Sequence, residues 1–183
     1  MNWIQSLRHK HSLNVFRKRT RKVNFPHEFV DLEVAQTIGF IVNVELFSAN
    51  ELVYFTKYIT QLEDKGKKVV VIEVSHKRKS TPMFSSSVAS VFINPSQINW
   101  LMFPSVTRLQ EINRKKCDIL VNLDSSEKMT SMFVCGLSNA KTRVGLHVNG
   151  HEDFYELMLQ LPIETKLPKI LEIFETYSKM LEK

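Results

Sequence analysis

The stretch TIGFIVNVELFSANELVYFTKYITQLEDKGKKVVVIEV, residues 37–74, decides the fold because it contains a complete β-α-β pattern. Its two ends, TIGFIVNV and KVVVIEV, are continuous β-prone runs of the kind found in strands buried on both faces. Between them, Ser48 and Glu51 form a capping-box pattern that begins an amphipathic helix, and Gly66 follows where helices commonly end. A crossover this short predicts two parallel strands with a right-handed connection.

The alternation of strands and helices continues to the end of the chain. Further strands are predicted at 88–93, 117–123, 142–147 and 154–161, and further helices at 105–116, 124–138 and 165–181. This alternation predicts a three-layer, Rossmann-like α/β sandwich with a mostly parallel sheet. The short strands 88–93 and 154–161 are expected at its edges. We expect a single α/β domain over residues 35–183, preceded by a basic helical arm and linker over residues 1–34.

The composition is that of a soluble globular protein. The chain has 183 residues, of which 43% are apolar and 24% charged, and this length suits one domain. No apolar run approaches the roughly 18 residues of a membrane-spanning helix, and the start lacks the apolar segment of a secretory signal. Cys117 and Cys135 are too few for a disulfide framework, so the expected location is the reducing cytoplasm.

Positive charge is concentrated at the amino terminus of a chain whose formal net charge is +6. Residues 1–22 contain seven Lys and Arg and no Asp or Glu, whereas the rest of the chain contains 18 bases and 19 acids. The seven cations are Arg8, Lys10, Arg17, Lys18, Arg19, Arg21 and Lys22. Charge separated in this way bears on binding partners rather than on the fold.

The basic segment is predicted to be helical, because residues 2–22 contain neither Gly nor Pro. One apolar stripe at helical spacing consists of Ile4, Leu7, His11 and Val15. We expect the first turns of this helix to dock weakly on the body through that stripe, and the later turns to face solvent or a polyanion.

Two polar segments follow predicted strands, and ligands of parallel α/β sheets bind beyond the carboxyl ends of strands. The first is a basic loop suited to an anion, made of His76, Lys77, Arg78, Lys79 and Ser80. The second places a carboxylate and two hydroxyls together as Asp124, Ser125 and Ser126. Both are candidate anion- or ligand-binding segments. The alternatives are a solvated loop for the first and a helix N-cap for the second.

The motifs of several enzyme classes are absent from the sequence. The five glycines form neither GxGxxG nor GxxxxGK[ST], which removes the usual means of cradling a phosphate. There is no GxSxG nucleophile elbow. The i,i+4 pair His147 and His151 lacks the further ligands of a metal site. The prediction therefore leans against an enzyme, with no catalytic residue, metal or cofactor.

An aromatic cluster precedes the helix at 105–116. Its members are Phe92, Trp100 and Phe103. They are predicted to pack in the core, and the alternative is an exposed stacking platform.

The segment CDILVNLDSSEKMTSMFVCGLSNAKTRVGLH, residues 117–147, resembles the amino-terminal domain of heptosyltransferase-like GT-B glycosyltransferases. That resemblance implies a Rossmann-like fold and a nucleotide or nucleotide-sugar ligand. The basic start, TIGFIVNV, INWLMFP and CDILVNLD followed by LSNAKTRVG are together similar to a family of small, uncharacterised bacterial proteins. Its members pair a basic amino-terminal helix with one Rossmann-like domain. This second resemblance implies the fold and a bacterial cytoplasm, but no catalytic residue.

The sequence therefore favours a non-enzymatic binding module. Its basic helix would dock on a polyanion, with structured RNA or DNA in a larger ribonucleoprotein assembly as the first expectation. A second hypothesis is peripheral attachment to an anionic membrane through Trp3, Ile4 and Leu7. A third is a nucleotide- or nucleotide-sugar-binding remnant that uses the loop at 76–80 together with Asp124.

Overall fold

A computed structural model describes residues 3–21, 28–84, 89–126, 129–148, 150–162 and 164–180. Its described strands form one six-stranded sheet in the order β3-β2-β1-β4-β5-β6. The strands are β1 (Thr37–Val42), β2 (Lys68–Val74), β3 (Ala89–Ile93), β4 (Ile119–Asn122), β5 (Thr142–Leu146) and β6 (Leu157–Leu159). All neighbouring strands pair in parallel. The Rossmann-like prediction is confirmed, and the two strands expected at the edges lie there.

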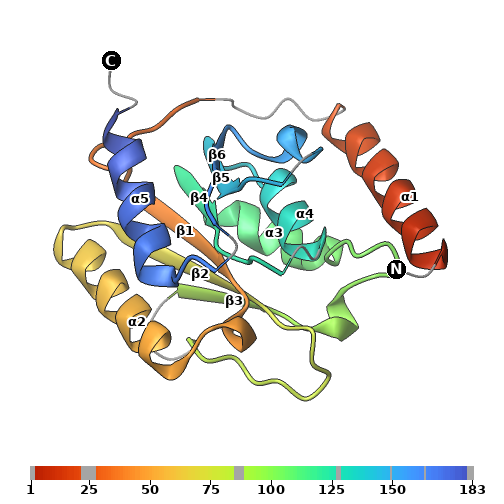
Figure 1. Cartoon of the computed structure of the whole chain (residues 1–183), viewed down its shortest axis with the longest axis horizontal. Coiled ribbons are helices and arrows are strands. Elements are labelled where there is room, and N and C mark those ends of the chain that lie inside the picture. Colours follow the sequence, from red (N-terminus) through yellow and green to blue (C-terminus); the bar gives the residue numbers. More distant parts are fainter. Residues whose placement is uncertain are drawn as a thin grey trace.

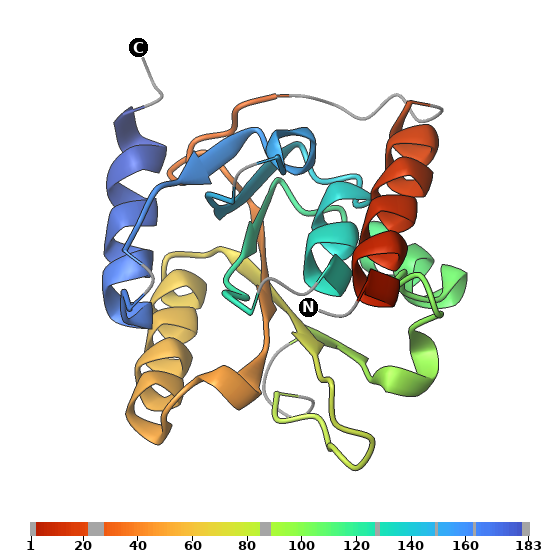
Figure 2. The same cartoon turned by 45° about the vertical axis from the view of Figure 1, so that its right-hand side comes forward.

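Helices cover both faces of the sheet. They are α1 (Trp3–Thr20), α2 (Ala49–Asp64), α3 (Val106–Arg114), α4 (Met129–Gly136) and α5 (Leu167–Met180). Helices α2 and α5 lie on one face, α3 and α4 lie on the other, and α1 lies outside α4 (Figures 1 and 2). The predicted capping box of α2 is present, because Ser48 and Glu51 bond reciprocally.

The helices bury both faces of the strands. Phe40 of β1 points into the core beneath α2, where it meets Phe55 edge-on with ring centroids 5.5 Å apart. Its neighbour Ile41 points into the opposite core, in the cluster that also contains Val134 of α4. Both side chains of β1 are fully buried, as side-chain alternation in a doubly covered strand requires.

The connection from β2 to β3 contains no helix within its described part, residues 75–84. A buried carboxylate fixes this connection instead. Glu73 of β2 accepts the backbone N–H groups of Met83, at 2.8 Å, and Phe84, at 3.0 Å. Phe84 thereby packs edge-on against Phe55, with centroids 5.7 Å apart. The loop thus supplies an aromatic side chain to the core beneath α2.

Asp118, just before β4, ties three segments together. Its carboxylate accepts the N–H groups of Gln36 at 2.9 Å and Thr37 at 3.0 Å, and it pairs with the Lys141 ammonium at 3.0 Å. Burial alone would raise the pKa of Asp118, but these donors and the ammonium outweigh it and hold the pKa below 3.8. The entry to β1 is therefore anchored to β4 and β5.

We predict that Asp118→Asn is less stable than wild type at pH 7, and that the difference shrinks as the pH falls. A native pKa below the unfolded value means that the folded state binds fewer protons. The stabilisation is therefore full above about pH 5 and is lost as the pH falls through about 4 and below. Urea denaturation between pH 3 and 7 measures it. A stability difference that does not change with pH would contradict this role.

Candidate functional site

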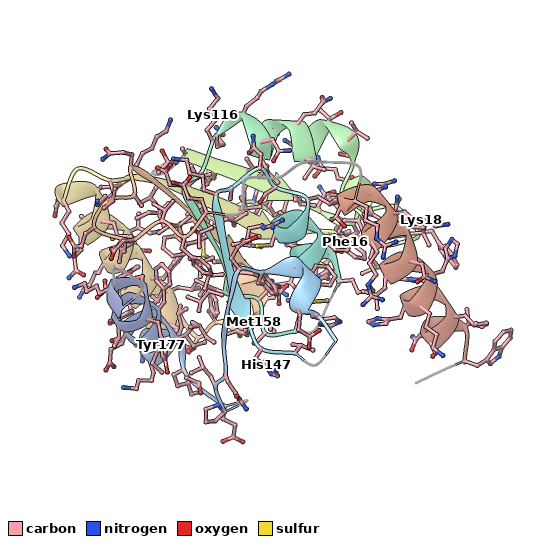
Figure 3. All side chains as sticks on the ribbon, turned by 90° about the horizontal axis from the view of Figure 1, so that it is seen from above. Phe16, Lys18, Lys116, His147, Met158 and Tyr177 are labelled. Carbon is pink, nitrogen blue, oxygen red and sulfur yellow. The ribbon has the colours of Figure 1, made fainter. Side chains whose placement is uncertain are left out.

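Helix α1 is held against α4 by an aromatic stack. Phe16 is fully buried, and its ring stacks on Phe154 with centroids 4.2 Å apart and on Phe133 at 5.4 Å. Gly136 of α4 makes room for this ring, because a Cβ there would lie 2.6 Å from the ring edge. Figure 3 shows Phe16 between α1 and α4, and Lys18 on the far side of α1.

The predicted docking stripe of α1 was wrong. Ile4 and Leu7 are 49% and 56% exposed, whereas the buried positions of α1 are Ser12 and Phe16 in its second half. The cause is the aromatic cluster on α4 and beside β6, which selects the helix face that carries the one phenylalanine of α1. That rotation turns Ile4, Leu7 and His11 toward solvent, whereas Val15 is half-buried and packs against the aromatic cluster. We call Trp3, Ile4, Leu7, Lys10 and Lys18, all of them exposed, the outward face of α1.

The six predicted cations that lie within the described residues have three kinds of surroundings. Lys10 and Lys18 are exposed, and neither has an ion-pair partner within the described ranges. Arg8 and Arg19 turn to aromatic rings of the body. The Arg8 guanidinium lies 5.9 Å from the centroid of the Trp100 ring and also donates to the sulfur of Met102. The Arg19 guanidinium lies 4.5 Å from the centroid of the Phe103 ring. Such cation–π contacts fasten the helix while leaving the charge in place.

Arg17 and Arg21 lie at a polar cavity of about 560 Å³ that also contains body acids. Its lining includes Glu152 and Glu156. Glu156 is itself bound by the buried Arg143, whose Nε lies 3.0 and 3.1 Å from the two carboxylate oxygens. These two cations of the arm therefore face negative charge of the body. Lys22, the last predicted cation, lies outside the described residues.

The basic loop at 76–80 is anchored at its start and exposed beyond it. Ser75 donates to the Glu45 carboxylate at 2.6 Å and accepts the N–H of Lys77 at 3.1 Å. The Lys77 ammonium lies 4.0 Å from Glu45. Burial alone would raise the pKa of Glu45, but the Ser75 hydroxyl and the Lys77 charge outweigh it and lower the pKa. Arg78 and Lys79 are exposed, and His76 and Ser80 are half-buried.

A pocket opens at the carboxyl ends of β4, β5 and β6. It encloses about 110 Å³, and we call it the strand-end pocket. Its polar lining consists of Asn122, Asp124, Ser125, His147, Tyr155 and Thr165, and its apolar wall includes Leu146, Leu159, Leu161 and Ile170. Asp124 and Ser125 of the predicted segment line this pocket, and the loop at 76–80 does not. The two predicted segments are therefore not brought together in one site.

Asp124 organises the strand-end pocket. Its carboxylate accepts the N–H of Ser126 at 3.0 Å and the hydroxyl of Ser131 from α4. Asn122 accepts the N–H of Asp124 at 3.1 Å and donates to the Tyr155 hydroxyl at 2.8 Å. Asn122 was missed although it stands two positions before Asp124 in the sequence. No sequence motif around Tyr155 pointed to the site. Tyr155 reaches the pocket only because β6, which follows it, pairs with β5.

The remaining predictions about single residues have mixed outcomes. Phe103 is fully buried, as predicted, but Trp100 is 65% exposed. Cys117 and Cys135 are buried free thiols, and burial raises the pKa of Cys117 to about 12. Among the described residues, no group of three or more His, Cys, Asp or Glu side chains is placed to hold a metal ion. No described helix is long and apolar enough to cross a bilayer.

Comparison with known proteins identifies the chain more closely than its motifs do. A family of unknown function, DUF6913, has a model that matches residues 8–181, so the match includes most of α1. A search of curated proteins found no match. Among solved structures, the chain is similar to a glycosyl transferase family 9 protein from Veillonella parvula DSM 2008. Identity is 14%, and the alignment has a TM-score of 0.47 and covers 75% of this chain and 40% of that protein.

We predict that Gly136→Ala destabilises the protein more when Phe16 is present than when it is absent. Alanine adds up to about 1 kcal/mol of helix propensity, but its Cβ would lie 2.6 Å from the Phe16 ring and 3.0 Å from the Phe154 ring. Phe16→Ala alone should lower the free energy of unfolding by about 3–5 kcal/mol. In the Phe16→Ala background, Gly136→Ala should cost less, because the closer of the two ring contacts is gone. Urea denaturation of the four proteins forms a double-mutant cycle.

Val53 is exposed on α2, and Val53→Ala is the control for this cycle. It should change the free energy of unfolding by no more than about 0.5 kcal/mol. Additive effects of the two replacements would show that Phe16 does not pack on Gly136.

Proposed function

We propose that this chain, which belongs to the DUF6913 family of unknown function, is a non-enzymatic docking module that binds an anionic surface through the outward face of α1. The observation that carries the proposal is the exposure of large apolar side chains beside unpaired lysines. Trp3 is 69% exposed, and Ile4 and Leu7 are half exposed. Lys10 and Lys18 follow on the same helix, and residues 1–22 contain no carboxylate.

An anionic membrane surface fits this composition best. Tryptophan, leucine and isoleucine partition into the headgroup region, while lysines meet the charged lipids. Trp100 extends the apolar area, because it is exposed and lies next to Arg8. The body holds α1 in place through Phe16, so the helix does not have to fold on binding. Binding then avoids the ordering cost that a disordered basic segment incurs.

Nucleic acid is the second candidate partner. Lys10 and Lys18 are free to neutralise phosphates and release counterions, which gives affinity with little sequence selectivity. If the partner is a nucleic acid, the basic arm favours structured RNA within a ribonucleoprotein assembly. The exposed apolar side chains have no role in backbone contacts of that kind, and for this reason we rank nucleic acid below the membrane.

Two double variants separate the candidates. Trp3→Ser/Leu7→Ser removes apolar area, and Lys10→Gln/Lys18→Gln removes charge. On phosphatidylcholine vesicles containing phosphatidylserine, each variant should weaken co-sedimentation by about tenfold or more, since a surface lysine contributes about 1 kcal/mol and a buried apolar side chain about 1.5–3 kcal/mol. Tyr177→Ser, a matched loss of an exposed aromatic residue on α5, should bind like wild type.

The same proteins titrated with an RNA hairpin differ in one respect if nucleic acid is the partner. The apolar variant would then bind like wild type, and the lysine variant would lose about two units of the logarithmic salt slope. Absence of binding to both vesicles and RNA at low salt would contradict the docking proposal as a whole.

A further inference from the structure

We infer that the strand-end pocket binds a small organic cation, with an ammonium group held at Asp124 and an apolar body against the surrounding wall. This site is separate from the outward face of α1 and does not depend on the docking proposal. It follows from the charge, burial and hydrogen bonding of the residues that line the pocket.

The carboxylate of Asp124 is buried without a counter-ion. The residue is 8% exposed. The Ser126 N–H and the Ser131 hydroxyl are the groups that donate to its carboxylate, and within the described chain it has no ion pair. A carboxylate out of water is costly unless it is both hydrogen-bonded and paired. Two donors supply the first condition, and a ligand ammonium in the pocket supplies the second.

Tyr155 gives the pocket a second feature suited to a cation. Its hydroxyl accepts the amide N–H of Asn122 at 2.8 Å. Burial raises the pKa of Tyr155, and the nearby Cys135 and Asp124 add to the effect, so the phenol stays neutral. Its ring lies against Gly145, where any Cβ would collide with it. Tyr155 lines the pocket together with Asp124, and a neutral aromatic ring beside a carboxylate is an environment that favours an ammonium group.

The lining selects against anions. Among the residues that the structure describes, the lining contains no lysine or arginine, and Asp124 is the one carboxylate there. A phosphate or carboxylate ligand would therefore meet negative charge without compensation. Asp124 is thus a ligand-binding candidate for cations and not for anions. The apolar wall of Leu146, Leu159 and Ile170 accommodates a hydrocarbon body, and the volume of about 110 Å³ restricts that body to a small one.

Three probes with the same ring and different charge test the inference. They are cyclohexylamine, cyclohexanol and cyclohexanecarboxylate, each titrated into the full-length protein and followed by thermal denaturation and by calorimetry. Cyclohexylamine should raise the melting temperature saturably, as a ligand of the native state must. The carboxylate should have no effect, and the alcohol should bind at least about tenfold more weakly than the amine.

Two variants locate the charge. Asp124→Asn should weaken amine binding by about tenfold or more, and the matched exposed replacement Asp64→Asn on α2 should not change it. If Asp124→Asn does not fold, Ser125→Lys serves instead, since Ser125 is exposed at the rim and a lysine there offers Asp124 an internal ammonium. Equal binding of all three probes, or amine binding unchanged in Asp124→Asn or Ser125→Lys, would overturn the inference.

Discussion

The packing of Phe16 against α4 is the interaction on which the surface of this protein depends. All residues of α4 are buried, although one side of this short helix faces away from the sheet. That side is covered by α1, whose Phe16 ring occupies the space left by Gly136. Once the Phe16 ring is in place, the rotation of α1 about its axis is fixed. This rotation determines which side chains of α1 face the solvent.

This arrangement separates two surfaces that use different chemistry. The outward face of α1 is cationic and apolar, whereas the strand-end pocket contains the buried carboxylate of Asp124. A buried aromatic cluster, made of Phe16, Phe103, Phe133 and Phe154, belongs to the core between α1 and α4. The strand-end pocket contacts that core through Tyr155 and Met132. The docking proposal and the cation-binding proposal therefore concern two different surfaces of the body, and each can be tested without the other.

The sequence was sufficient for the fold class, though not for the order of the strands, because most elements have their own local signal. Continuous apolar runs predicted the parallel strands, the capping box predicted the start of α2, and shortness predicted which strands lie at the edges. The rotation of α1 was not predictable, since it depends on how one aromatic ring fits a glycine more than a hundred residues away. The roles of Asp118 and Glu73 were not predictable either, because their carboxylates accept backbone N–H groups whose positions depend on the folded chain.

The candidate sites were predictable in part. The position of Asp124 after β4 followed from the strand pattern, but its lack of a counter-ion required the neighbouring elements. The cations of the arm were visible in the sequence, whereas their division into exposed lysines and arginines bound to the body was not. The domain boundary at residue 34 and a cytoplasmic location stay predictions.

Amide hydrogen exchange of the full-length protein tests the central claim most directly. Most of the stability of a helix in a protein comes from tertiary packing rather than from the helix itself, so strong protection of α1 requires docking. We predict that the amides of residues 12–20 exchange as slowly as those of α4, and that both segments lose protection together in Phe16→Ala. Exchange of residues 12–20 at the rate of an unfolded chain, with α4 still protected, would contradict the account.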